Sequence, residues 1–199
     1  MSWSLGETAA LALKATRGAG MSWGLAEETA ASVVWLHSRG LPGMSALCGY
    51  LGSANTFRTD EPACPIITGC ALIDGSTEAP DRLSVSRDLG LVQAPLLLLP
   101  FVARLDPGTI WLHAPGLGGV ADQTDGDRWQ SHCLRGAASC RIEYRDRPQI
   151  DPGRERLTRL GEQFACCVDR LGTFAHRTYA PATGQSRMSG AGAGLTDND

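Results

Sequence analysis

The chain has 199 residues, 43% of them hydrophobic, which suits one domain with a sizeable core or one domain with an extension. Its formal net charge is −3, and Lys14 is the only lysine, so arginine supplies nearly all of the positive charge. The sequence contains no basic stripe or block. This argues against nucleic-acid binding and against binding to a membrane surface.

The location expected from the sequence is the cytoplasm. Residues 1–7 lack the basic and apolar regions of a signal peptide. The most apolar run, residues 89–105, contains Gln93, Pro95 and Pro100, so it is too short and too interrupted to cross a bilayer and indicates a buried strand. The seven cysteines are an odd number, which together with the missing signal peptide predicts reduced thiols.

Two helices are predicted at the start of the chain, over residues 5–16 and 25–37. Ser4 can cap the first helix, and Glu7 three residues later completes a capping box. The Met-Ser-Trp that opens the chain recurs twenty residues later, and Glu-Thr-Ala-Ala follows both copies. This repetition predicts a helical hairpin whose small faces allow close packing. The residues of these faces are Ala9, Ala10, Ala26, Ala30 and Ala31.

The middle of the chain is predicted to form an antiparallel sheet, because short apolar runs alternate with clusters of Pro, Gly and Asp. The alternation of polar and apolar residues over 141–145 is typical of a half-exposed antiparallel strand. Pro95 and Pro100 flank a run of four leucines, so that strand is expected to be short or at an edge. The predicted strands are residues 66–73, 83–86, 96–104, 109–113 and 138–144.

A last helix is predicted over residues 153–176, with Asp151 as its cap and Pro152 in its first position. Its apolar stripe is expected to cover one face of the sheet. The sequence therefore predicts an α+β fold: an N-terminal helical hairpin, an antiparallel sheet in the middle, a C-terminal helix and a Gly-rich tail. Residues 1–180 are expected to form a single domain, and residues 181–199 a docked tail. The apolar stripe of the last predicted helix comprises Leu157, Leu160, Phe164, Val168 and Leu171.

The tail carries the first candidate for a ligand site. Gly190, Gly192 and Gly194 can expose backbone N–H groups as an anion-binding nest, and Arg187 can hold a carboxylate or phosphate with two hydrogen bonds. Arg17 is expected to bind the same anion. The tail lacks both the Gly-Lys-Ser/Thr of a P-loop and the preceding strand of a dinucleotide fingerprint. Docking onto the domain or a partner, and plain disorder, are the alternatives for this segment.

Two histidines are the candidates for moving protons. His113 ends a predicted strand and precedes a glycine-rich loop, so it could act as a base beside an oxyanion hole. His176, at the end of the last predicted helix, is the second candidate. The hydrolase elbow Gly-x-Ser-x-Gly is absent from the sequence, and the alternative for His113 is a surface histidine in a turn.

The cysteines predict neither a metal site nor a cofactor. No pair has Cys-x-x-Cys spacing, and zinc sites usually show such close ligand pairs. Cys166 and Cys167 lie beside apolar residues on the last predicted helix, where filling of the core is the default role. A catalytic thiol is left open at Cys64, Cys70 or Cys133.

Both ends of the chain resemble a known family. The segments are Ser-Leu-Gly-Glu at residues 4–7, Lys-Ala-Thr-Arg-Gly-Ala-Gly-Met-Ser-Trp-Gly-Leu-Ala-Glu-Glu at 14–28 and Gly-Ala-Gly-Ala-Gly-Leu-Thr-Asp-Asn-Asp at 190–199. They resemble a family of bacterial proteins of unknown function and similar length. The resemblance implies a cytoplasmic bacterial protein tied to small-molecule catabolism, and it carries over no catalytic residue.

Two functional hypotheses follow. The first is an enzyme or ligand-binding domain that acts on a small anionic metabolite. The second is a non-catalytic subunit or homo-oligomer whose helical hairpin and tail pack on a partner. The first predicts a polar, concave site that meets the tail, whereas the second predicts an exposed apolar patch around Trp3 and Trp23.

Overall fold

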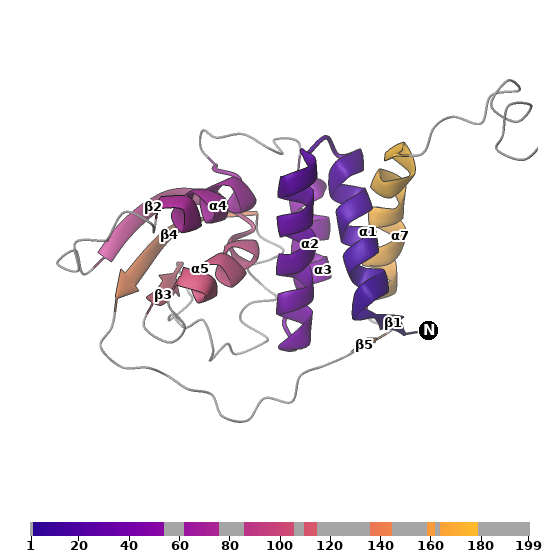
Figure 1. Ribbon diagram of the computed structural model, residues 1–199, viewed down its shortest axis with the longest axis horizontal. Helices are drawn as coiled ribbons and strands as arrows, with labels where there is room; N and C mark the ends of the chain where they lie inside the picture. Colours follow the sequence, from indigo (N-terminus) through magenta and orange to yellow (C-terminus); the bar gives the residue numbers. More distant parts are fainter. Residues whose placement is uncertain are drawn as a thin grey trace, which may run out of the picture.

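The computed structural model describes residues 2–53, 62–75, 86–105, 110–114, 136–144, 159–161 and 164–178. Figure 1 shows two parts that lie side by side. One part is a group of helices, α1, α2, α3 and α7, and the other is a sheet of β2, β4 and β3 with α4 and α5 beside it. The predicted α+β class is therefore confirmed, with a helical hairpin first, an antiparallel sheet in the middle and a helix near the C-terminus.

The N-terminal hairpin forms as predicted from α1 (Leu5–Gly18) and α2 (Trp23–Ser38). The capping box is present: Glu7 N donates to Ser4 Oγ over 3.2 Å, and Ser4 N donates to Glu7 Oε2 over 2.7 Å. These bonds satisfy donors that a helix start otherwise leaves unpaired. The small residues buried on the two helices let them pack closely. They are Ala12, Ala15, Ala26 and Ala30, whereas Ala10 and Ala31 of the predicted small faces are exposed.

A third helix, α3 (Gly43–Leu51), follows the hairpin and is absent from the prediction. Pro42 precedes it and offers no side chain that could cap it. His37 of α2 fills this role, because its Nε2 accepts a hydrogen bond from Met44 N over 2.9 Å. Burial lowers the pKa of His37 to about 4, so the ring stays neutral and can accept this bond.

The C-terminal helix differs from its prediction in start and packing. It is α7 (Ala165–Ala175), followed by the short 3-10 turn η3 (His176–Thr178). The prediction of helix across residues 159–160 is wrong, because these residues form β5, which pairs with β1 (Trp3–Ser4). The predicted packing is also wrong, because α7 covers α1 and α3 rather than the sheet. Gly18 permits the contact with α1, since a Cβ there would overlap the carbonyl of Phe174.

The antiparallel sheet has the order β2-β4-β3, with β2 (Ser86–Gln93), β4 (Ala137–Tyr144) and β3 (Ile110–His113). The predicted strands at 109–113 and 138–144 are thereby confirmed for their described residues. Ser86, the last residue of the predicted strand 83–86, begins β2, and residues 83–85 lie outside the described ranges. Leu112 and Ile142 are buried on the side where α4 and α5 pack.

Two predicted strands are helices. Residues 66–73 belong to α4 (Pro65–Gly75), and residues 96–104 form η1 (Pro95–Leu98) and α5 (Leu99–Leu105). Both segments are so apolar that neither a helical nor a strand period is visible in them. Pro95 and Pro100 occupy first turns of these helices, where a missing N–H costs little. Ala94, with a left-handed φ of 42°, turns the chain from β2 into η1.

The core lies where the four leucines at residues 96–99 pack between the helical group and the sheet with its helices α4 and α5. The side chains of 96–99 are at most 1% exposed, and Phe101 is fully buried. Gly69 of α4 packs against the Phe101 ring, so α4 and α5 approach closely. In the portion of the chain that the structure describes, no helix is long and apolar enough to cross a membrane. The tail, residues 181–199, lies outside the described residues.

Candidate functional site

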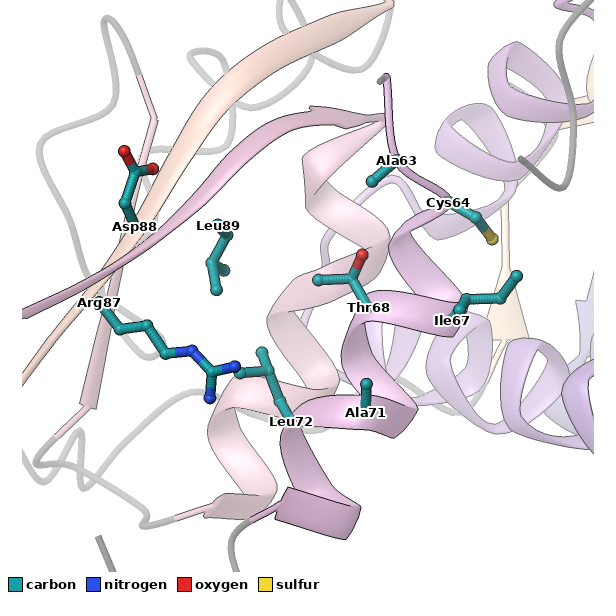
Figure 2. Close-up of a pocket in the computed structure, with 9 residues that line it drawn as sticks. All are labelled: Ala63, Cys64, Ile67, Thr68, Ala71, Leu72, Arg87, Asp88 and Leu89. Carbon is teal, nitrogen blue, oxygen red and sulfur yellow. The ribbon is translucent and has the colours of Figure 1, made fainter. Parts of the chain in front are cut away.

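A β-bulge in β2 sets the geometry of the candidate site. The register passes from Asp88 opposite Arg141 to Gly90 opposite Cys140, so Leu89 is an extra residue in β2. Gly90 adopts a left-handed φ of 69°, and its N–H donates to Asp88 Oδ1 over 3.0 Å. A bulge re-aims the side chains around it. Arg87 and Asp88 lie before the bulge and point to opposite faces of β2, as neighbouring strand residues do, and Figure 2 shows Asp88 pointing away from the space that Arg87 enters.

Beside the bulge, α4 and β2 enclose a cleft of about 320 Å³. Figure 2 shows Leu89 pointing into this cleft from β2, with the Thr68 hydroxyl directed into it from α4. The Arg87 side chain extends across the cleft towards Leu72, which places its guanidinium at the rim. The remaining wall is mostly apolar. It comprises Ala63, Cys64, Ile67 and Ala71, and Asp88 also lines the cleft, with its side chain directed away from it.

One end of the cleft is fixed by backbone hydrogen bonds. Ala63 forms a parallel bridge with β2, in which its N–H donates to Leu91 O over 2.7 Å. Gln93 N donates back to Ala63 O over 3.0 Å. These two bonds hold the start of α4 against the strand, so the cleft is formed by the fold itself and not by a side-chain rearrangement.

The cleft offers chemistry suited to a small anion. A guanidinium is planar, permanently charged and able to hold a carboxylate or phosphate with two parallel hydrogen bonds. The Thr68 hydroxyl can donate or accept one further bond. The apolar side chains beside these groups lower the local dielectric, which strengthens the polar contacts. The carboxylate of Asp88 points away from the cleft, so it does not face an anion bound there.

The open face of the sheet carries a second polar group of residues. Across the strands, Asp88 lies opposite Arg141, which lies opposite His113. His113 Nε2 is 2.7 Å from Glu143 Oε2, and the two side chains are only 20% and 24% exposed. The Trp111 ring stacks beside His113 at a centroid distance of 6.4 Å. A carboxylate at this distance orients an imidazole, as in acid–base catalysis.

The structure distributes the site residues predicted from the sequence over separate regions. His113 lies on β3, in the sheet. Arg17 lies at the end of α1, where it donates a hydrogen bond to Met21 O and stacks 4.9 Å from the Trp23 ring. His176 is exposed in η3, which packs on α1. The described residues therefore do not bring His113 together with Arg17 or His176.

The predicted anion nest of the tail cannot be placed in this arrangement. Its residues, Arg187, Gly190, Gly192 and Gly194, lie outside the described residues. Cys133 lies outside them as well. Of the other two thiols left open for catalysis, Cys64 is 2% exposed and accepts a hydrogen bond from Tyr50 over 2.9 Å, and burial raises the pKa of Cys70. No group of three or more potential metal ligands occurs within the described part of the chain.

Sequence reasoning missed Arg87, Thr68 and Glu143 as site residues. Thr68 falls within a segment predicted as a strand, and the structure places it on α4. The Asp-Leu-Gly sequence at 88–90 contains a glycine inside a strand, which is a known sign of a bulge and could have drawn attention to Arg87. The alternation of 141–145 does place Glu143 on the polar side of its strand. Its pairing with His113 depends on a strand register that the sequence does not specify.

Comparison with known proteins adds a family for the first part of the chain. Residues 3–79 match the model of a family described as "Protein of unknown function (DUF3726)". This confirms the resemblance to an uncharacterised family over that segment, which is less than half of the chain. The match includes α4 but ends before β2, so it covers the helical wall of the cleft and not Arg87. No curated protein and no solved structure matches the chain.

Proposed function

We propose that the protein is a ligand-binding domain for a small anionic metabolite, held in the cleft between α4 and β2 by Arg87. The observation that carries this proposal is the placement of the Arg87 guanidinium at the rim of an apolar-walled cleft. A volume of about 320 Å³ suits a small metabolite rather than a dinucleotide. The resemblance of the sequence supports a setting in small-molecule catabolism in a bacterial cytoplasm.

The His113–Glu143 pair supports an enzyme as a second candidate function. The 2.7 Å distance between Nε2 and Oε2 gives the ring an oriented carboxylate partner, as a general acid or base requires. Because this pair lies on the open face of the sheet and Arg87 on the covered side, a substrate would have to reach around the edge strand β2. His113→Asn should abolish turnover of any anion that the protein consumes while leaving its binding intact. Unchanged turnover would remove His113 from catalysis.

The interaction-protein hypothesis has weaker support. Trp23 is 61% exposed, as a partner-binding tryptophan would be, but Trp3 is half-buried against the core. The two residues begin successive antiparallel helices, so they lie at opposite ends of α1, about 20 Å apart for a helix of 14 residues. They therefore do not form one apolar patch.

Thermal unfolding against a panel of small carboxylates and phosphates tests the proposal. A ligand at a hundred times its dissociation constant should stabilise the folded state by about 2.7 kcal/mol. In a chain of this length, that is a midpoint shift of roughly 5–10 °C. We expect Arg87→Gln to lose this shift.

Arg141→Gln is the matched control, because it removes the same charge from the open face of the same sheet. It should retain the shift. If Arg141→Gln or Arg187→Ala alone loses the shift, the anion binds at the open face or the tail, and the proposed cleft is wrong. If no anion in the panel stabilises the protein, the proposal of a small anionic ligand fails altogether.

A further inference from the structure

The contact between α3 and α7 contains a cluster of thiols around an arginine. Ser45 of α3 contacts Cys167 of α7, and Gly52 at the end of α3 contacts Arg170, one turn further along α7. Cys48 lies between Ser45 and Gly52 on the same face of α3, so it faces Cys167 and Arg170. Ser45 Oγ lies 3.7 Å from Cys167 Sγ and holds the second thiol in place. Two helices far apart in the sequence thus bring two thiols onto facing sides of one helix contact.

Gly52 at the end of α3 makes room for Arg170. A Cβ at this position would overlap the guanidinium, so a larger residue would displace the arginine from the thiols. The guanidinium also lies near the C-terminal end of α3, where the helix dipole favours a positive charge. The position of the charge beside Cys48 is therefore built into both helices.

The electrostatics of the cluster give the two thiols different protonation states. The hydrogen bond from Cys167, with the charge of Arg170, lowers the pKa of Cys48 to about 7 against the opposing effect of burial. The hydrogen bond to Cys48 and burial together raise the pKa of Cys167 well above its ordinary value. Cys140, which has no such partners, has its pKa raised by burial to about 12. At pH 7, about half of Cys48 is therefore thiolate, beside a protonated Cys167.

The pair lies close to the surface, because the neighbouring residue Cys166 on α7 is exposed. Cys48 itself is 6% exposed, which leaves access only for a small reagent. The arrangement differs from that of a core cysteine such as Cys140, which is 1% exposed and whose thiol bonds to a backbone carbonyl.

We propose that Cys48 and Cys167 are a redox-active dithiol pair, which small hydroperoxides oxidise to a disulfide that joins α3 to α7. The Cys48 thiolate attacks one peroxide oxygen, the O–O bond breaks, and the leaving oxygen takes a proton from solvent to form water or an alcohol. Cys48 is then a sulfenic acid. Cys167 attacks its sulfur, the S–O bond breaks, and water leaves with the proton of Cys167. The two thiols lose two electrons, which the peroxide gains.

Peptide mapping after mild oxidation tests the pair directly. The reduced full-length protein is treated with hydrogen peroxide at neutral pH, the remaining thiols are alkylated, and the peptides are identified by mass spectrometry. We expect a Cys48–Cys167 disulfide as the first product, with Cys140 still reduced. Oxidation of other cysteines while Cys48 stays reduced would overturn the proposal. Conversion of Cys48 to a sulfinic acid while Cys167 remains a thiol would overturn it as well.

Variants separate the roles within the pair. In Cys167→Ser, Cys48 should stop at the sulfenic acid, which dimedone traps, whereas Cys140→Ser should still form the disulfide. Arg170→Gln should slow alkylation of Cys48 by iodoacetamide at pH 7 about fivefold, which corresponds to a rise of about one unit in its pKa. Arg177→Gln, which removes the same charge from η3, is the control. Equal alkylation rates in the two arginine variants would contradict the role given to Arg170.

Discussion

Acidification should destabilise the protein through His37. This ring is 4% exposed, accepts a hydrogen bond from Met44 N and stands edge-on to the Phe164 ring at 4.9 Å. Burial lowers its pKa from 6.5 to about 4. The unfolded chain therefore takes up a proton on this histidine near pH 6.5, whereas the folded protein does so only near pH 4. Protonation thus favours the unfolded state over this interval.

The size of the effect follows from the shift in pKa. Each unit corresponds to about 1.4 kcal/mol, so the difference between 6.5 and about 4 amounts to about 3 kcal/mol. The full contribution to stability is present above pH 6.5 and is lost progressively as the pH falls to about 4. For a chain of this length, that loss is roughly 6–12 °C in the unfolding midpoint.

Urea unfolding followed by tryptophan fluorescence at several pH values between 7.5 and 4 measures this contribution. Other carboxyl groups titrate in the same range, so the informative quantity is the difference in unfolding free energy between the wild type and His37→Gln. Glutamine can still accept the bond from Met44 N, but it does not titrate. The wild type should lose about 3 kcal/mol relative to the variant across this range. A difference that does not change with pH, or that changes in the opposite direction, would refute the burial of a neutral His37.

Two further predictions concern packing and capping. Gly69→Ala should lower the free energy of unfolding by about 1–3 kcal/mol, because the new methyl group collides with Phe101. Gly172→Ala is the control: it has open space around it, so it should be neutral or stabilise α7 by up to about 1 kcal/mol. Equal effects of the two substitutions in urea unfolding would contradict the close contact of α4 with α5. Ser4→Ala should cost about 1 kcal/mol by removing the oxygen that accepts from Glu7 N, and an unchanged urea midpoint would mean that the capping box contributes no stability.

Local rules predicted the parts of the fold that depend on neighbouring residues. The capping box at Ser4 and Glu7 and the repeated Glu-Thr-Ala-Ala are short-range features, and they placed the hairpin correctly. The alternation around Ile142 likewise placed β4. Each of these patterns is complete within a few residues, so tertiary contacts are not needed to read it.

The wrong assignments arose where tertiary contacts decide. Residues 66–73 are rich in β-branched side chains, yet they form α4 because Gly69 lets the helix press against Phe101. Propensity is only a weak prior against such packing. The helix α3 was missed because Pro42 gives no cap, and its cap comes from His37 on another helix.

The candidate site could be predicted only in part for the same reason. His113 was recognised from its place at the end of a strand, but its partner Glu143 comes from the neighbouring strand through a register that the sequence does not specify. Arg87 faces the cleft because it pairs opposite the buried Ile142, a register that the sequence does not specify either. Cys48 and Cys167 face each other only because α3 packs on α7, and these two helices are separated by most of the chain.

The central proposal is that an anion binds beside Arg87, and amide chemical shifts test it most directly. Nitrogen-15-labelled protein is titrated with the carboxylate or phosphate that stabilises it most, and the perturbed amides are assigned. We predict that the shifts concentrate in Thr68 of α4 and in residues 87–90 of β2, and that Arg87→Gln removes them. Shifts confined to the open face of the sheet or to residues 187–194, with those of α4 and β2 unchanged, would contradict it.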